Sequence, residues 1–211
     1  MNEELKKIVA LYKTAASLKQ LPRQGWIMEG ALLSEADTVA AHSFSVALIS
    51  YLTANAFISR FPDINIGKVT IMAVFHDLGE SATGEIATGV KAWITKNFPS
   101  ENIIEKIEHD TLGSLVNEVT GGNEIYDLLL EYDKCDSKEA KIVKFGDVVD
   151  AFAYAKDRMN KTFPDYLKKV RQKLSQNSIH GHDEFGNLLS TWIEEIEKDW
   201  EAINKNEPWK K

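Results

Sequence analysis

Apolar residues recur at the three- and four-residue spacing of an α-helix along most of this chain, and the alternation typical of β-strands is nearly absent. Glycine and proline, which interrupt helices, account for only 12 and 5 of the 211 residues. A chain of this length also buries a sizeable core. We therefore predict an all-α fold, a single compact helical bundle. The expected helices are residues 3–20, 38–59, 66–80, 87–97, 100–120, 124–132, 137–160, 163–176 and 184–204.

Local signals mark where some of these helices begin and end. Pro22 ends the first helix, because proline lacks the amide that would continue it. Residues 23–30 are then predicted to form a loop. Ser34 and Asp37 offer side-chain oxygens that cap the start of the long helix that follows.

The composition narrows the class of protein. A net charge of −7 argues against binding to duplex nucleic acid, which needs clustered Lys and Arg, but a local cation or metal still allows a small anionic ligand. Cys135 is the single cysteine, so we expect no disulfide framework and a cytoplasmic location. Neither a signal-peptide pattern nor an apolar run of about 18 residues suggests a membrane. No linker separates two domains, so we expect one domain over residues 1–211, with a core of about 5–160 and the helices of about 163–204 packed on it.

One apolar run ends in three polar groups. The segment Ile71–Glu80 reads IMAVFHDLGE, so His76, Asp77 and Glu80 follow directly on buried-type residues. Desolvating such groups without a partner is costly. A divalent metal binds imidazole and carboxylate well, and a cap-and-salt-bridge cluster at a helix end is the alternative. On a continuous helix Glu80 would share the face of His76 and Asp77.

Two other predicted helices offer groups of the same kind. His42 lies on the side of the core stripe of the 38–59 helix, where a satisfied core histidine is the alternative. Asp147 lies in a largely buried helix and needs a cation or several donors there. A buried ion pair would also satisfy it, and Asp150 could be the functional acid instead. Together, two imidazoles and two carboxylates form a plausible ligand set with positions left for water and substrate: His42, His76, Asp77 and Asp147.

The order His, His-Asp, Asp resembles the HD-domain metal-dependent phosphohydrolases, and most of all their single-domain 5′-deoxynucleotidase-like group. The resemblance covers about residues 5–160, and its specific segments are PRQGW at 22–26, HDLGESATGEI at 76–86 and EAKIVKFGD at 139–147. It implies an all-helical, usually dimeric enzyme that acts on a small-molecule nucleotide. It also implies one divalent metal ion (Mn, Co, Mg, Fe, Ni or Zn) bound through His42, His76, Asp77 and Asp147.

The resemblance further implies roles for single residues in removing the 5′-phosphate from (deoxy)nucleoside monophosphates. Asp77 would be catalytic through the metal, and Glu80 would orient or deprotonate water or protonate the leaving oxygen. Arg23 would pair with a phosphate, and Trp26 would pack on the sugar or base. A solvated loop arginine and a core anchor are the alternatives for these two. Glu85 stands where the group has an aspartate near the sugar hydroxyls.

Several positions depart from the group's pattern, among them Val148 and Val149, which replace charged residues after Asp147. Ala41 replaces an acid before the first histidine, Glu29 lies where many relatives have a further arginine, and Glu85 is longer than aspartate by a methylene. These departures keep two alternatives open. One is hydrolysis of another phosphoester, such as a nucleoside triphosphate, an alarmone or a small metabolite phosphate. The other is nucleotide binding without turnover.

The remaining histidines and tryptophans carry weaker signals. His109 lies in a highly charged helix and is expected to be solvated, which favours a single metal. His180 and His182 lie in a polar turn and are expected to bind no metal. The helix that carries Trp192 and Trp200 is amphipathic, which suits packing in the core or in a dimer.

Overall fold

The computed structural model describes residues 2–98, 103–160, 164–175 and 183–204. Within these ranges it consists of helices and turns, with one isolated β-bridge between Pro22 and Thr38, and so confirms the all-α prediction. No helix among the described residues has the length and apolar character that crossing a membrane requires. The elements are α1 (Glu3–Ala16), η1 (Ser17–Lys19), α2 (Gln24–Met28), α3 (Val39–Phe57), α4 (Ile66–Phe75), α5 (Glu80–Thr83), α6 (Thr88–Asn97), α7 (Ile103–Val116), α8 (Gly122–Lys134), α9 (Lys138–Met159), α10 (Pro164–Ser175) and α11 (Glu184–Asn204).

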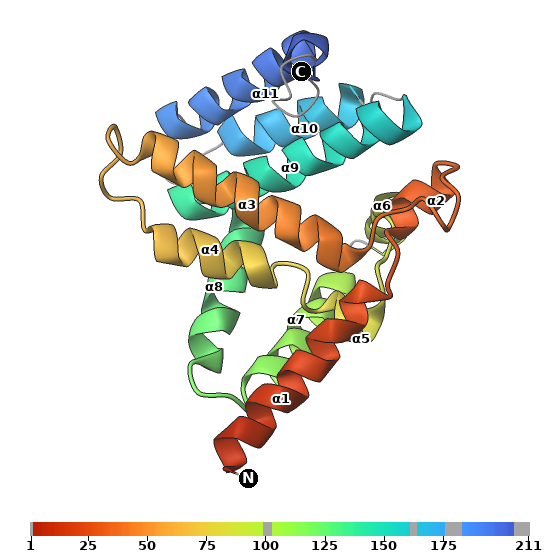
Figure 1. Cartoon of the computed structure of the whole chain (residues 1–211), viewed down its shortest axis with the longest axis vertical. Helices are drawn as coiled ribbons and strands as arrows, with labels where there is room; N and C mark the ends of the chain where they lie inside the picture. The colour runs from red at the N-terminus through yellow and green to blue at the C-terminus, as the bar shows by residue number, and fades with distance from the viewer. Residues whose placement is uncertain (1, 99–102, 161–163, 176–182, 205–211) are drawn as a thin grey trace.

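Helix α9 forms the centre of the bundle, and α3 packs on one side of it. Helix α3 also packs on α4, while α8 packs against both α4 and α9 (Figure 1). Helices α10 and α11 pack on each other and on α9. The main core joins apolar side chains from all these helices: Val46, Phe57, Met72, Leu128, Val143, Phe152, Leu167, Leu189 and Ile193 are among its buried members.

The amphipathic C-terminal helix belongs to this core. Ile193 is buried in it, and Trp192 and Trp200 are partly buried against it. Core packing therefore accounts for the apolar face of α11. His180 and His182 lie outside the described residues.

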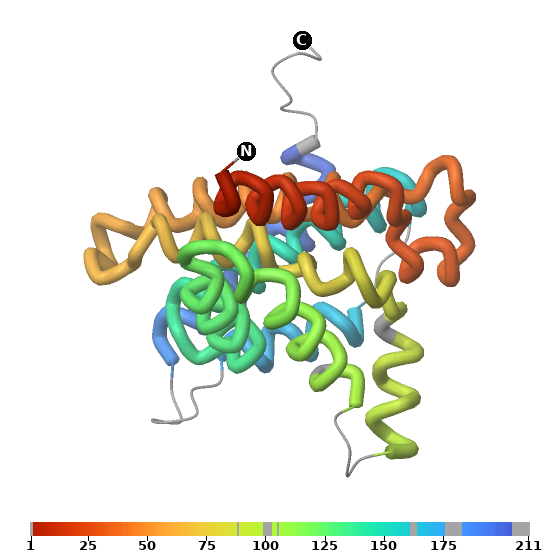
Figure 2. The backbone as a smooth tube through the Cα atoms, turned by 90° about the horizontal axis from the view of Figure 1, so that it is seen from below, coloured from red at the N-terminus to blue at the C-terminus, as the bar shows by residue number. Residues whose placement is uncertain are grey.

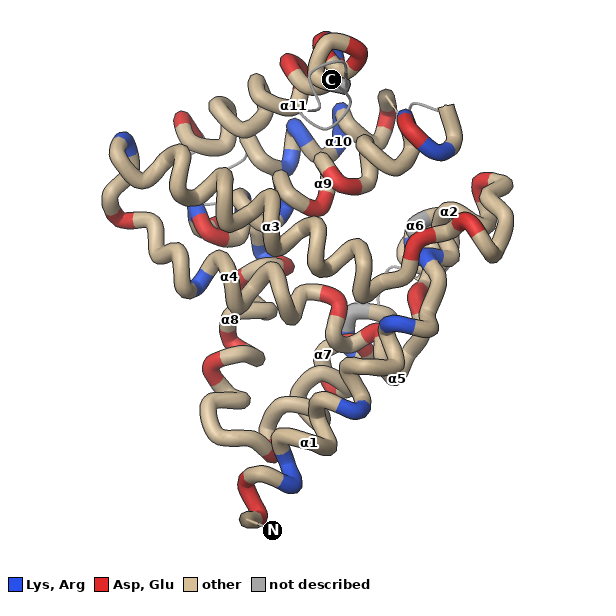
Figure 3. The backbone as a smooth tube through the Cα atoms, viewed as in Figure 1, with Lys and Arg blue, Asp and Glu red and all other residues tan. Residues whose placement is uncertain are grey.

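A smaller core supports the N-terminal half. Leu78, Leu112, Val116 and Leu129 join the turn after α4 to α7 and α8, with α1 packed against them. Helices α1 and α3 lie along the same face of the molecule, as Figure 2 shows when compared with Figure 1. The whole length of α3 lacks Asp, Glu, Lys and Arg, so its tube carries no charge colour in Figure 3.

Three local predictions were wrong. The predicted loop 23–30 contains the short helix α2, and Thr38, not Ser34 or Asp37, caps α3 by accepting the amide of Ala41. The predicted helix 66–80 ends at Phe75 and resumes only at Glu80. The physical reasons are local contacts that periodicity does not report.

The break after α4 has such a cause. The His76 ring nitrogen Nδ1 lies 2.8 Å from the Ala73 carbonyl, the acceptor that the Asp77 amide would take in a continuous helix. The following amides instead bond three residues back, from Leu78 to Phe75 and from Glu80 to Asp77. His76, Asp77 and Glu80 therefore do not share one face of a continuous helix, and a tight turn presents them instead.

Candidate metal centre

Three elements bring the four predicted ligands together. His42 comes from the first turn of α3, His76 and Asp77 from the turn after α4, and Asp147 from the middle of α9. The two histidine Nε2 atoms are 3.4 Å apart. Asp77 Oδ2 lies 3.7 Å from Nε2 of His42 and 3.3 Å from Nε2 of His76. Asp147 Oδ1 lies 3.4 Å from Nε2 of His42.

This donor set fits a divalent metal. Ligand atoms of His42, His76 and Asp147 all lie within 4.8 Å of one another, and the Asp77 oxygen adds a second carboxylate beside them. Two imidazoles and two carboxylates suit Mn, Fe, Co, Ni or Zn, and carboxylates also suit Mg. The residues present therefore fit one ion of this class.

Each histidine is oriented by its other ring nitrogen. Nδ1 of His42 lies 2.6 Å from Asp150 Oδ2, and Nδ1 of His76 lies 2.8 Å from the Ala73 carbonyl. Both partners are acceptors, so each Nδ1 carries a proton, and with a metal bound each Nε2 would offer its lone pair to the shared centre. The sequence left open whether Asp147 or Asp150 is the functional acid. In the structure, Asp150 contacts Nδ1 of His42 and Asp147 contacts Nε2 of the same ring.

Asp147 divides its carboxylate between two partners. Oδ1 faces His42, while Oδ2 lies 2.6 Å from Lys144 Nζ and 3.3 Å from the Tyr132 hydroxyl that donates to it. Burial would raise the pKa of Asp147, but the Lys144 charge and the bond from His42 hold it well below its ordinary value. Asp147 is therefore an anion whose two oxygens point at different neighbours.

The electrostatics of the two other buried ligands follow the same pattern. Burial alone would lower the pKa of His42, but hydrogen bonds to Asp147 and Asp150 raise it to about 9. Burial alone would raise the pKa of Asp77, but the His76 and His42 rings beside it hold it well below its ordinary value. Without a metal, a proton on His42 balances part of the carboxylate charge.

Glu80 lies in the wall of the same cavity. This cavity has a volume of about 320 Å³ and is lined by all four ligands together with Glu80, Arg23 and Glu85. Glu80 Oε2 is buried and has no hydrogen-bond partner among the described residues. Burial, with Asp77 and Glu85 nearby, raises the pKa of Glu80 to about 9. At neutral pH Glu80 is therefore a carboxylic acid, able to donate a proton into the cavity.

Arg23 and Trp26 form the other side of the site. Arg23 Nε lies 3.3 Å from Glu85 Oε1, and its guanidinium lies 5.8 Å from the Trp26 ring. Trp26 is 8% exposed and stacks on Tyr154 with ring centroids 4.8 Å apart. Together with Ala87, Ala151 and Tyr166, both residues also line an adjoining cavity of about 240 Å³. Trp26 is thus an anchor in the core and a wall of this cavity at once.

Comparison with known proteins identifies the family. The family model described as HD domain matches residues 15–200. The chain belongs to the HD-domain family. The matched residues run from the end of α1 to α11, beyond the segment in which the sequence motifs lie.

This HD-domain chain has relatives along most of its length. A 5′-deoxynucleotidase of Dictyostelium discoideum is 32% identical over 69% of this chain and 76% of that protein. A 5′-deoxynucleotidase of Schizosaccharomyces pombe is 24% identical over 94% of both chains. Among solved structures, a protein of Pyrococcus horikoshii superposes with a TM-score of 0.68 at 26% identity, over 92% of this chain and 98% of that one.

The expectation that His109 is solvated was only partly right. His109 is not simply solvated: it lines the cavity, and its Nε2 lies 2.7 Å from Asp133 Oδ2. Lys91 of α6 lines the same wall and pairs with Glu108 at 2.6 Å. These residues come from α6, α7 and α8.

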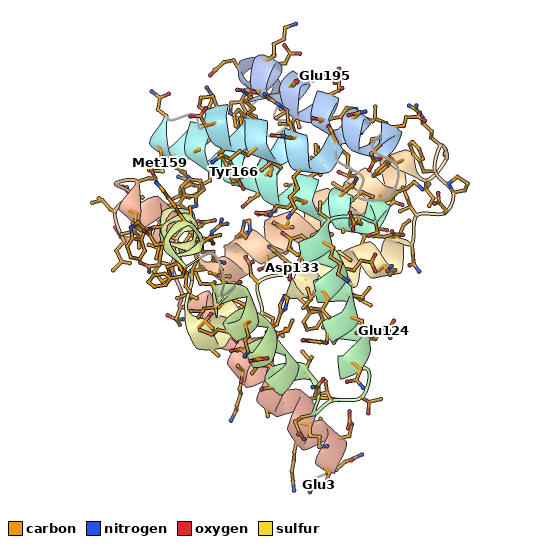
Figure 4. The ribbon with its side chains drawn as sticks, turned by 180° about the vertical axis from the view of Figure 1, so that it is seen from behind. Glu3, Glu124, Asp133, Met159, Tyr166 and Glu195 are labelled. Atoms are coloured by element: carbon orange, nitrogen blue, oxygen red, sulfur yellow. The ribbon has the colours of Figure 1, made fainter. Side chains whose placement is uncertain are left out.

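Several cavity residues escaped the sequence reading. Lys144 precedes Asp147 by three residues, so helical spacing could have found that pair. Tyr166, from α10, had no local signal, since only the packing of its helix brings it to the cavity. Figure 4 shows Tyr166 on α10 and Asp133 on α8, two residues that line this cavity. Burial raises the pKa of the Tyr166 hydroxyl to about 12, so it enters the site as a neutral group.

Proposed function

We propose that this HD-domain protein is a divalent-metal-dependent phosphohydrolase that removes the 5′-phosphate from (deoxy)nucleoside monophosphates. The observation that carries the proposal is the convergence of two Nε2 atoms and two carboxylate oxygens in a cavity that Glu80 and Arg23 also line. Relatives named 5′-deoxynucleotidase, two of them aligned over most of this chain, support the substrate class.

The ligand residues would hold one ion. We assign His42, His76, Asp77 and Asp147 to it, since their donor atoms converge and the other polar side-chain atoms of His42, His76 and Asp147 are held by other groups. A bound divalent ion would act as a Lewis acid toward the phosphoryl group and lower the pKa of water. The donor types do not select among Mn, Co, Mg, Fe, Ni and Zn.

The chain's own residues then supply binding and proton transfer. Arg23 is the cation placed to pair with the substrate phosphate, and a guanidinium matches two phosphate oxygens at once. The leaving 5′-oxygen must gain a proton as the P–O bond breaks. Without a metal Glu80 holds such a proton at neutral pH because its pKa is raised to about 9, and it lines the cavity beside the ligands, so we assign it as the general acid. The cavity beside Trp26 would accept the nucleoside.

The test is phosphate release from a nucleotide panel by the purified protein with Mn²⁺ or Co²⁺. We expect release from dAMP-like monophosphates, and loss of both bound metal and activity in His76→Ala and Asp147→Ala. Asp110→Ala, an exposed aspartate of α7, is the matched control and should behave as wild type. Full activity in either ligand variant would refute the metal assignment. Release only from triphosphates, alarmones or metabolite phosphates would replace the substrate class, and nucleotide-dependent thermal stabilisation without release would make the protein a binding module.

We also propose a homodimer formed through the exposed face of α3. Phe44, Leu48 and Leu52 form one helical stripe and are 70%, 49% and 57% exposed, and Val74 of the neighbouring α4 is 50% exposed. The outer face of a helix in a monomer normally carries charge, whereas α3 carries none (Figure 3). In a twofold contact the residues on the axis meet their own copies, so an uncharged face avoids like-charge repulsion in a chain of net charge −7.

The dimer is tested by sedimentation equilibrium or light scattering. We expect a dimeric mass for the wild type and a monomeric mass for Leu48→Glu. Val90→Glu, an equivalent change at a 37% exposed position of α6, should remain dimeric. A monomeric wild type would refute the proposal.

We further propose one HD domain with a cytoplasmic location. The family match extends through α11, and Cys135 is free and buried, as suits a reducing compartment. Fluorescent tagging tests the location, and limited proteolysis tests whether the helices 164–175 and 184–204 stay attached to the rest.

A further inference from the structure

The guanidinium of Arg23 is held on one edge only. Its Nε lies 3.3 Å from Glu85 Oε1, and the two side chains are 15% and 11% exposed. Its Nη1 is buried and has no hydrogen-bond partner among the described residues. A buried guanidinium nitrogen without an acceptor is costly, so this edge is suited to an anionic ligand.

Both oxygens of Glu85 are already engaged. Oε1 accepts from Arg23 Nε, and Oε2 accepts the backbone amide of Gln24, the first residue of α2. Gly84, with φ of 73°, turns the chain just before Glu85. The carboxylate thus ties the loop after α5 to the residue that begins α2, and each of its oxygens already accepts one hydrogen bond within the protein.

We propose that Glu85 is a positioning residue for phosphate recognition, acting through Arg23 and not by touching the sugar. It occupies the Nε edge of the guanidinium and so leaves the Nη1 end for two phosphate oxygens. This inference rests on the proposed function, in which Arg23 binds the phosphate. A side chain fixed before the ligand arrives loses less freedom on binding, which strengthens the contact.

Two substitutions at position 85 distinguish this role from a sugar contact, one by the length of the side chain and one by its donor group. Aspartate at this position is one methylene shorter and cannot bridge Arg23 Nε and the Gln24 amide from the same backbone. Glutamine keeps the length, but its amide nitrogen faces one of two donors, so one of the two bonds is lost. Either change should loosen Arg23 and leave contacts to the nucleoside untouched.

The experiment measures binding of separate substrate parts to the metal-loaded protein. Calorimetric titration with inorganic phosphate and with 2′-deoxyadenosine is made for wild type, Glu85→Gln, Glu85→Asp, Arg23→Ala and the double variant Glu85→Gln/Arg23→Ala. We expect both Glu85 variants to bind phosphate roughly tenfold more weakly, from the loss of one charge-assisted bond, with nucleoside binding unchanged. The double variant should bind phosphate as weakly as Arg23→Ala alone, because Glu85 acts only through Arg23.

Kinetics give an independent readout. For Glu85→Gln we expect a raised KM with an unchanged ratio of kcat/KM for dAMP over AMP. Glu131→Gln, which removes a carboxylate paired with Lys68 at 2.8 Å outside the cavity, is the matched control and should match wild type. Thermal unfolding of the metal-free variants checks that they fold.

Three results would overturn the inference. These are unchanged phosphate binding in both Glu85 variants, weaker nucleoside binding or an altered dAMP-to-AMP ratio, and additive losses in the double variant. If the wild type released no phosphate from any nucleotide, the proposed function would fail. The phosphate titrations would still report whether Glu85 acts through Arg23.

Discussion

Gly146 is a position of close approach between α3 and α9, directly before the ligand Asp147. A Cβ atom built on Gly146 would lie 2.5 Å from Ser50 Oγ and 3.1 Å from the Val46 carbonyl oxygen. The Ser50 hydroxyl can turn, but the Val46 carbonyl is helix backbone and cannot. The substitution Gly146→Ala therefore has to push α9 away from α3, and Asp147 is the next residue along α9.

The magnitude follows from two opposing effects. Forcing an extra methyl group into a packed core costs about 1–3 kcal/mol, while alanine in place of glycine inside a helix gains at most about 1 kcal/mol. We expect a net loss of up to about 2 kcal/mol in the free energy of unfolding. Moving Asp147 away from His42, now at 3.4 Å, should also weaken metal binding.

Urea unfolding and Mn²⁺ titration of the same variant measure both effects. Gly89→Ala is the matched control, because a Cβ there would meet no atom within 4 Å. It should be neutral or stabilising by a few tenths to about 1 kcal/mol, with unchanged metal affinity. Ser50→Gly added to Gly146→Ala should recover part of the metal affinity by removing the nearest obstacle.

The reasoning would be refuted by a Gly146→Ala protein as stable as wild type with unchanged Mn²⁺ affinity. Loss of stability without loss of metal affinity would refute only the expected effect on metal binding, because the helices would then have separated without displacing Asp147.

Three further predictions concern the metal site. Asp150→Asn should weaken Mn²⁺ binding about 10–100-fold by calorimetry, because His42 loses its charged partner, whereas the exposed Asp127→Asn should not. In the metal-free protein the pKa of His42 is raised from 6.5 to about 9 and that of Glu80 from 4.5 to about 9, so the folded state holds protons that the unfolded chain has released. Its stability in denaturant titrations with EDTA should fall from about pH 4.5 through Glu80, and more steeply from pH 6.5 to 9, where His42 adds to the loss. The stabilisation gained from Mn²⁺ should grow between pH 6.5 and 9, and a flat EDTA curve would contradict this. Lys144→Met should cost the metal-free protein about 3–5 kcal/mol, because it strips the Asp147 carboxylate of its buried partner, and saturating Mn²⁺ should narrow that gap in matched unfolding curves.

The helical fold could be predicted because its signal is local. Most expected helices exist with ends close to those observed, since periodic apolar side chains and capping groups act within a few residues. The errors lie where a side chain competes with the backbone. The His76 ring near the Ala73 carbonyl ends α4 early, and no periodicity reports such a contact.

By itself, the sequence determined which kinds of groups the site contains: two imidazoles, several carboxylates and one arginine, in an order typical of HD domains. Only the tertiary structure decided which atoms of these groups meet. Asp150 and Asp147 lie three residues apart on one helix, yet they contact opposite nitrogens of His42. Glu85 reaches Arg23 across 62 positions of sequence. Such pairings depend on how the helices pack, and packing is set by contacts between distant segments that local spacing does not encode.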